Sequence, residues 1–338
     1  MGMVFLSEPP SFTFTRPILS LILGNTMLST VPGISGAGPS PEKTLYTPIL
    51  DAELVARGSI TSMSEKPNTP TGCPTPATIT RSMVELTGLA PLFINAGLRY
   101  SPTVPCLDVY GTPGEDPRYG EAVPGVAGLF EKGQYIASIY NSISDLLVLG
   151  ECVPGGTTTA LCVLRALGYD ARVSSSFVEN PHGLKDEVAE LALHRIRYDG
   201  ITDPLDIIRY AGDPMMAVAA GIATAYEGTL VLAGGTQMLA VAALLGTMGE
   251  AMPPLATTVY LRDDPSASFA ATVEEVGTTA YYVDPAFGGL GHGGLARYCI
   301  GEVKEGMGAG GAMLLARIMG YTPEEITGSI LRFVDSYD

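Results

Sequence analysis

Short apolar runs bounded by glycine or polar residues recur along the chain and alternate with longer stretches of helical periodicity. Such runs are typical of strands that are buried on both faces of a sheet. They predict strands at Ile18–Leu23, Leu92–Ile94, Leu146–Leu149 and Leu230–Leu232, and the start of a further short strand at Ala171–Val173.

Between these runs, apolar residues recur at helical spacing, often behind a capping residue or a proline. The last helix has the clearest start, because Thr322-Pro323-Glu324-Glu325 has the pattern of a capping box. The predicted helices are Thr47–Val55, Pro76–Gly88, about Gln134–Ile143, Thr157–Leu167, about Leu184–Ile196, Met215–Tyr226, Gln237–Met248, Gly308–Met319 and Pro323 to about Val334. The stretches Val31–Pro41 and Gly58–Pro76 predict loops, and a loop as long as the first is either disordered or functional.

This alternation predicts an α/β fold with a mostly parallel, Rossmann-like sheet and helices on both faces. We expect one α/β unit over residues 1–338, with its core at about 85–300 and the chain ends 1–60 and 305–338 packed as a smaller subdomain. In such folds the ligand crevice lies beyond the carboxyl ends of the strands. That rule places these residues within reach of one site: Asn25, Glu151, Gly155, Gly156, Gly234 and Gly235.

The segment Leu146–Gly168 reads as a strand, a glycine-rich turn and a helix. Backbone N–H groups at a helix start lack partners inside the helix, and Gly155 and Gly156 let an anion approach them. Thr157 and Thr158 add hydroxyl donors, so the turn suits a phosphate, with Glu151 beside it for a sugar hydroxyl. An ordinary turn capped by threonines also accounts for the segment. This turn contains neither GxxxxGK[ST] nor GxGxxG, which excludes it as the usual triphosphate or dinucleotide loop.

Composition narrows the class of ligand. The 338 residues are 46% hydrophobic with a formal net charge of −16, which argues against binding to nucleic acid or to an anionic membrane. The apolar runs are too short and too often interrupted to span a bilayer. Five cysteines without a CxxC pair fit reduced thiols in a cytoplasm. With three histidines and no HExxH motif, we expect neither a bound transition metal nor a cofactor.

The last third of the chain supplies a candidate for proton transfer. Glu305 lies between Lys304 and the glycine-rich Gly306–Gly311. A carboxylate with glycine neighbours can be approached by a flat ring, and burial would raise its pKa towards that of a general base. A solvated turn glutamate is the simpler alternative. His292, in another glycine-rich turn, is better explained as a turn histidine with satisfied hydrogen bonds than as an acid or a ligand.

Four segments in order resemble motifs of the nicotinate-nucleotide:dimethylbenzimidazole phosphoribosyltransferases, and most of all those of their shorter, archaeal-type members. They extend over about Gly150–Met319, and GNTMLSTVPGISGAG and PTPATITRSM near the N-terminus are also similar to those members. The base-pocket segment of the bacterial enzymes has no clear counterpart here. The four are GECVPGGTTTA (150–160), GDPMMAVAAGIATA (212–225), LVLAGGTQMLAVAAL (230–244) and KEGMGAGGA (304–312).

The resemblance implies transfer of the 5-phosphoribosyl group from nicotinate mononucleotide to a benzimidazole-like base, with inversion at the anomeric carbon, for the lower ligand of a cobamide. It makes Glu305 the catalytic base and Glu151 an acidic residue of the nucleotide site. Gly155, Gly156, Thr157 and Thr158 would hold the phosphate, while Gly234 and Gly235 would line the ribose or nicotinate side. It also implies a homodimer with small-molecule substrates. Two alternatives stay open: a non-catalytic ribotide-binding regulatory protein, and a transferase of the same fold for another base such as adenine.

Overall fold

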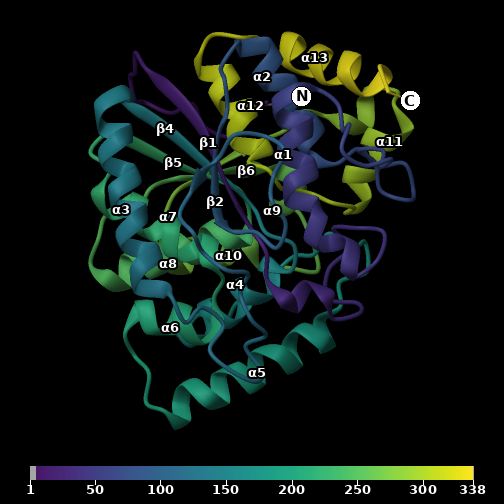
Figure 1. Cartoon of the computed structure of the whole chain (residues 1–338). Coiled ribbons are helices and arrows are strands. Elements are labelled where there is room, and N and C mark those ends of the chain that lie inside the picture. The colour runs from purple at the N-terminus through teal and green to yellow at the C-terminus, as the bar shows by residue number, and fades with distance from the viewer. Residues whose placement is uncertain (1–4, 338) are drawn as a thin grey trace.

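The computed structural model describes residues 5–337, and these contain a seven-stranded sheet in which every pair of neighbouring strands is parallel (Figure 1). The strand order is β3-β2-β1-β4-β5-β6-β7. The strands are β1 (Pro17–Gly24), β2 (Leu92–Gly97), β3 (Leu107–Asp108), β4 (Leu146–Cys152), β5 (Thr229–Ala233), β6 (Leu255–Thr258) and β7 (Ala280–Val283).

Helices cover both faces of this sheet, which confirms the predicted α/β fold. No helix of residues 5–337 is long and apolar enough to cross a membrane. The α-helices are α1 (Thr47–Arg57), α2 (Pro76–Thr87), α3 (Val126–Ile143), α4 (Gly156–Ala166), α5 (His182–Tyr198), α6 (Pro204–Ala211), α7 (Pro214–Ala225), α8 (Thr236–Met248), α9 (Val259–Arg262), α10 (Phe269–Val276), α11 (Gly293–Ala296), α12 (Ala309–Ile318) and α13 (Pro323–Asp335). Short 3₁₀ helices are η1 (Met27–Thr30), η2 (Glu42–Tyr46), η3 (Phe287–Gly289) and η4 (Arg297–Ile300).

The strand predicted at Ala171–Val173 is wrong. The backbone of Arg172 bonds to Ser268 instead of to a neighbouring strand: its N–H donates to Ser268 Oγ at 2.9 Å, and its carbonyl accepts from Ser268 N at 2.8 Å. The loop before α10 therefore holds this segment, which pairs with no strand. The helix expected near Gln134 starts earlier, at Val126.

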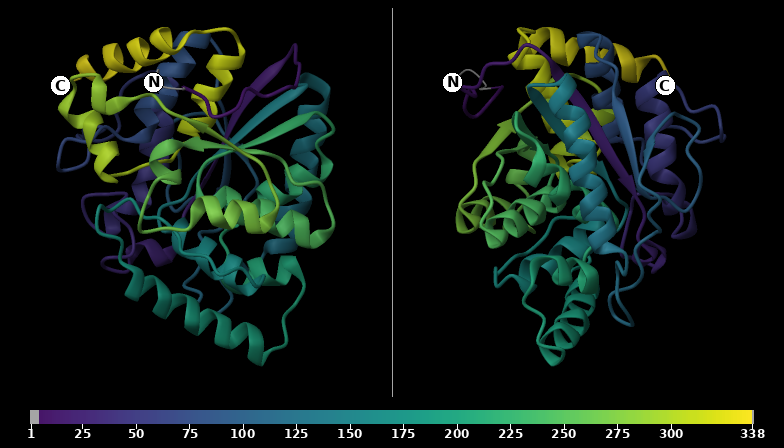
Figure 2. Two further views of the ribbon diagram at one scale, coloured as in Figure 1. Left: turned by 180° about the vertical axis from the view of Figure 1, so that it is seen from behind. Right: turned by 60° about the vertical axis from the view of Figure 1, so that its left-hand side comes forward.

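Side chains alternate across the central strands and divide the core into two clusters. Leu21 and Leu23 of β1 face the cluster formed with α1, α2, α12 and α13, whereas Ile22 faces the cluster formed with α3, α4, α7 and α8. Figure 2 shows the two layers of helices from other directions.

The C-terminal helices α12 and α13 lie beside α2, and α2 in turn packs against α1 (Figure 1). Segments from the two ends of the chain thus share one face of the sheet. That the ends form a separate subdomain stays a prediction, of which residues 1–4 and 338 lie outside the described residues.

Glycine lets α12 lie directly on the sheet. A Cβ at Gly311 would stand 2.2 Å from the Cβ of Ala233 on β5 and 3.0 Å from Cγ1 of Val148 on β4. No side chain fits there, so the glycines after Glu305 have a packing role. This contact fixes the N-terminus of α12 above the middle of the sheet.

The order of the strands reverses between β1 and β4. The chain proceeds from β1 through β2 to β3 on one side, and from β4 through β5 and β6 to β7 on the other. In open parallel sheets, ligands bind outside the carboxyl ends of the strands at such a switch point. Here those ends are Gly24 of β1 and Cys152 of β4.

Candidate active site

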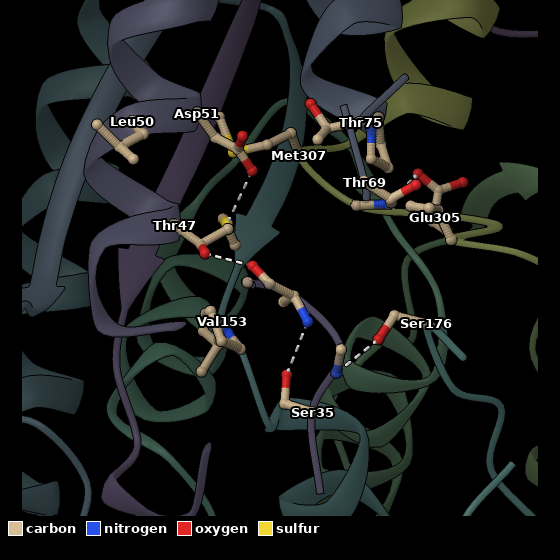
Figure 3. Close-up of a pocket in the computed structure, with 18 of the residues that line it drawn as sticks. Ser35, Thr47, Leu50, Asp51, Thr69, Thr75, Val153, Ser176, Glu305 and Met307 are labelled. Carbon is tan, nitrogen blue, oxygen red and sulfur yellow. Dashed lines mark hydrogen bonds between the residues drawn. The ribbon is translucent and has the colours of Figure 1, made fainter. Parts of the chain in front are cut away.

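A pocket of about 410 Å³ lies at this edge of the sheet (Figure 3). It is lined by the end of β4 and the turn after it at 151–155, by Thr157, and by residues 235–237 and 303–307. Its walls come from residues 174–176, from α1, and from the two loops around 34–39 and 60–70. Both long loops expected before α1 and α2 therefore contribute to one cavity.

Glu305 lies in the pocket with its carboxylate held from four directions. One oxygen accepts from the backbone N–H groups of Gly306 at 3.1 Å and Gly310 at 3.2 Å. The other accepts from Thr257 Oγ1 and Thr258 N, both at 3.1 Å. Burial raises the pKa of Glu305 to about 7, although these hydrogen bonds lower it. The result is a fixed, partly exposed carboxylate that exchanges protons near neutral pH.

Glu151 lines the same pocket and is 3% exposed. It accepts from Val153 N at 3.1 Å and from Gln237 Nε2 at 2.6 Å. Burial, then the nearby carboxylates of Asp213 and Glu305, raise its pKa to about 8. At neutral pH this side chain therefore carries a proton more often than an ordinary glutamate, and it can donate a hydrogen bond as well as accept one.

The glycine-rich turn is only partly a lining of the pocket. Gly155 and Thr157 line it, whereas Gly156 and Thr158 do not. A Cβ at Gly156 would stand 2.2 Å from Nε2 of Gln237, so this glycine is needed where Gln237 reaches Glu151. The Thr158 hydroxyl is buried and has no hydrogen-bond partner among residues 5–337.

Of the other residues predicted for the site, one lines the pocket and two do not. Gly235 lines the pocket beside Glu305, while Gly234 packs behind it against Met238 and Glu151. Asn25 does not line the pocket, although β1 ends beside it: its Oδ1 accepts from Arg99 N at 2.8 Å, which turns the side chain towards the loop after β2. The site thus brings together Glu305, Glu151, Gly155, Thr157 and Gly235, but neither Asn25 nor Gly156, Thr158 and Gly234.

Two buried lysines beside the pocket were missed by the sequence analysis. Lys185 Nζ donates to Thr157 Oγ1 at 3.2 Å and to the carbonyl of Ser174 at 2.5 Å. Lys304 Nζ donates to the carbonyl of Ser175 at 2.7 Å and lies 3.4 Å from Asp264 Oδ2. Burial, with the charge of Lys304, lowers the pKa of Lys185 to about 7.

A sequence signal for one of these lysines existed. Lys185 lies three and four residues before Val188 and Ala189, on the face of α5 that packs into the core. A lysine on an apolar stripe needs buried hydrogen-bond acceptors, and here the loop 174–176 supplies one. For Lys304 the only signal was its place next to Glu305.

Within residues 5–337, no three His, Cys, Asp or Glu side chains gather as a metal site would require. His292 Nδ1 accepts from Leu295 N at 3.0 Å, so this histidine caps α11 as expected of a satisfied turn histidine.

Comparison with known proteins identifies the family. No protein-family model matches the chain. A UPF0284 protein of Methanosarcina mazei is 43% identical over 323 residues, which are 92% of each chain. A UPF0284 protein of Thermococcus gammatolerans is 42% identical over 316 residues, 92% of this chain and 95% of the other. The chain belongs to the UPF0284 family.

Two solved structures have the fold of this UPF0284 protein. One is the nicotinate-nucleotide-dimethylbenzimidazole phosphoribosyltransferase of Thermus thermophilus, with a TM-score of 0.59 at 18% identity over 93% of this chain and 83% of that one. The other is CobT of the same organism, with a TM-score of 0.61 at 17% identity over 93% and 84%. The fold implied by the sequence motifs is therefore confirmed.

Proposed function

We propose that this protein is a phosphoribosyltransferase that moves the 5-phosphoribosyl group from nicotinate mononucleotide to a benzimidazole-like base. The observation that carries the proposal is Glu305: a carboxylate fixed by four donors, partly exposed in the pocket, with its pKa raised to about 7. A general base works best when its pKa lies near the working pH. The motifs that resemble the transferase family, and the fold shared with two of its structures, support the same reaction.

The chemistry needs one base and no acid. The bond between the anomeric carbon and the pyridinium nitrogen breaks, and its electron pair neutralises that nitrogen, so nicotinate leaves without a proton. One imidazole nitrogen of the acceptor forms the new bond from the opposite face, which inverts the anomeric carbon. The other imidazole nitrogen loses its proton to Glu305. The hydroxyl of Thr257 can rotate as Glu305 takes up that proton, whereas the backbone donors cannot.

The turn after β4 suits the phosphate of the donor. Gly155 and Thr157 line the pocket where α4 begins, and a helix N-terminus favours an anion. Lys185 lies beside the Thr157 hydroxyl, and a phosphate bound there would favour the charged form of this lysine, whose pKa is lowered to about 7 by burial. In the proposal, Gly156 supports this turn from behind, Glu151 meets a ribose hydroxyl, and Gly235 lines the ribose or nicotinate side.

The test is nicotinate release from nicotinate mononucleotide, with dimethylbenzimidazole, hydroxybenzimidazole and adenine offered separately and the products identified by chromatography and mass spectrometry. A ribotide of the mass expected for one of these bases supports the transferase. Binding of nicotinate mononucleotide without product from any base contradicts it and favours a ribotide-binding protein. Light scattering of the same preparation tests the expected homodimer.

A further inference from the structure

Asp51 is a buried carboxyl group that the protein leaves almost without hydrogen-bond donors. It lies on α1, is 8% exposed and lines the pocket. Among residues 5–337, the one hydrogen bond that its carboxyl group accepts comes from the thiol of Cys152, at a long 3.7 Å (Figure 3). A thiol is a weak donor.

The other buried acids of the chain are treated differently. Glu53, two residues later on the same helix, accepts from the backbone and hydroxyl groups of Thr61 and Ser62. Even Glu305, which is partly exposed, accepts four hydrogen bonds. Buried polar groups are nearly always paired, and an unpaired one that borders a cavity points to a partner outside the protein.

Asp51 lies next to the segments that carry the proposed reaction. Cys152, its only donor among the described residues, follows Glu151 on β4, and Met307, two residues after Glu305, lies close to Asp51 in the pocket (Figure 3). Apolar side chains line the same pocket: Met307 lies beside Asp51, and Leu50 and Val153 lie further from it (Figure 3). A flat ring in this space would meet apolar groups and one carboxyl group.

Burial raises the pKa of Asp51 to about 7, so both of its protonation states are accessible near neutral pH. The neutral acid donates one hydrogen bond and accepts another, and the carboxylate accepts only. A hydroxyl group, or an amino group beside a ring nitrogen, matches these states. A methyl group matches neither and would leave the acid unpaired.

We infer that Asp51 determines the acceptor specificity of the proposed transferase by pairing with an O–H or N–H group on the outer edge of the base. This inference rests on the proposed function and narrows its substrate class. The preferred acceptor is a hydroxylated benzimidazole or an aminopurine, and dimethylbenzimidazole is a poor one.

The experiment compares kcat/KM for hydroxybenzimidazole, adenine and dimethylbenzimidazole at fixed nicotinate mononucleotide, in the wild type and in Asp51→Leu. We expect the wild type to prefer hydroxybenzimidazole or adenine over dimethylbenzimidazole by about tenfold or more, because the methylated base leaves a buried polar group unpaired. Asp51→Leu should remove this preference or reverse it. Which polar base is used distinguishes an O–H partner from an N–H partner.

Leu50→Val is the matched control, since it changes the shape of the adjacent wall without changing a polar group; it should alter all three bases alike. Asp51→Ala carries the same expectation as Asp51→Leu if the larger side chain prevents folding. A wild-type preference for dimethylbenzimidazole would overturn the inference. An Asp51 variant that raises KM for nicotinate mononucleotide and leaves the ratio between bases unchanged would overturn it too. Absence of turnover with every base would instead contradict the proposed function itself.

Discussion

Replacing Glu305 by glutamine should affect catalysis more than folding. The hydrogen bonds that the carboxylate accepts stabilise the fold, whereas its buried charge destabilises it, and glutamine loses part of both. The amide can keep its oxygen on Gly306 and Gly310, and its NH₂ group then faces Thr258 N, which loses its acceptor at a cost of about 1–3 kcal/mol. The rise of the Glu305 pKa from 4.5 to about 7 means that folding disfavours the ionised side chain by roughly 3 kcal/mol. The neutral amide of glutamine avoids this cost. The two effects nearly cancel, so the variant should stay folded.

Turnover of Glu305→Gln should fall by about 10²- to 10⁴-fold, the usual contribution of a general base. The assay is the initial rate of nicotinate release in the presence of the best acceptor base, with calorimetry to show that nicotinate mononucleotide still binds. The wild-type kcat/KM should rise with pH through about 7 as Glu305 loses its proton, and the variant should lack this rise.

Glu53→Gln is the control at a second carboxylate with several donors, because Glu53 accepts from two backbone N–H groups, two hydroxyl groups and the Arg57 guanidinium but does not line the pocket. Burial by itself would raise the pKa of Glu53, but its hydrogen bonds lower that pKa to about 2, so the carboxylate stabilises the fold. Glu53→Gln should lower the melting temperature and keep turnover. Turnover of Glu305→Gln within about threefold of the wild type would refute its role as the base.

Three further predictions concern packing, donor binding and pH. Gly311→Ala should lower the free energy of unfolding by about 1–3 kcal/mol in denaturant titrations, because its Cβ meets Ala233; Gly183→Ala, with open space around it, should not. Lys185→Met should weaken binding of nicotinate mononucleotide by about tenfold or more in calorimetry, and unchanged affinity would exclude Lys185 from the phosphate site. Because the pKa of Asp51 is raised on folding, its contribution to stability is lost as pH rises from about 4 through 7. The melting temperature of Asp51→Leu should therefore rise relative to that of the wild type as pH increases from about 4 to 7. A constant difference between the two melting temperatures would contradict a raised pKa for Asp51.

The sequence predicted most of the fold because short apolar runs and helix caps are local signals. The capping box at Thr322 and Glu325 is present, and the central strands lie where the apolar runs placed them. The strands β3, β6 and β7 were not predicted, and the predicted strand Ala171–Val173 does not form. That segment is apolar at both ends, but the side chain of Ser268 takes the backbone hydrogen bond that a strand would need. Ser268 is almost a hundred residues away in the sequence, so the local pattern of apolar residues cannot indicate this hydrogen bond.

The candidate site was only half predictable for a similar reason. Topology placed the backbone of Asn25 at the correct edge of the sheet, but one hydrogen bond to Arg99 N turns its side chain away from the pocket. Gly156 looked like a phosphate ligand, yet its missing side chain makes room for Gln237. Glu305 and Thr157 were found because chemistry and position coincide there. Asp51 was missed because a single acid in a helix has no pattern until its neighbours are known.

An acidic protein would be expected to repel the proposed phosphorylated donor, but the charges close to the pocket differ from those of the whole chain. The chain carries a net charge of −16, but burial raises the pKa of Asp51, Glu151 and Glu305 to about 7, 8 and 7, so a substantial part of the charge expected from these acids is absent at neutral pH. Lys185 and Lys304 are buried against the loop 174–176, and burial lowers the pKa of both, that of Lys185 to about 7. Lys185 bonds to Thr157 where α4 begins, so a phosphate bound there would favour its charged form. The potential that a phosphate meets is set by these nearby groups, because more distant surface charges are screened within about 10 Å in ordinary salt. The burial that brings the pKa of Glu305 near neutrality would therefore also help an acidic protein to accept the proposed anionic donor.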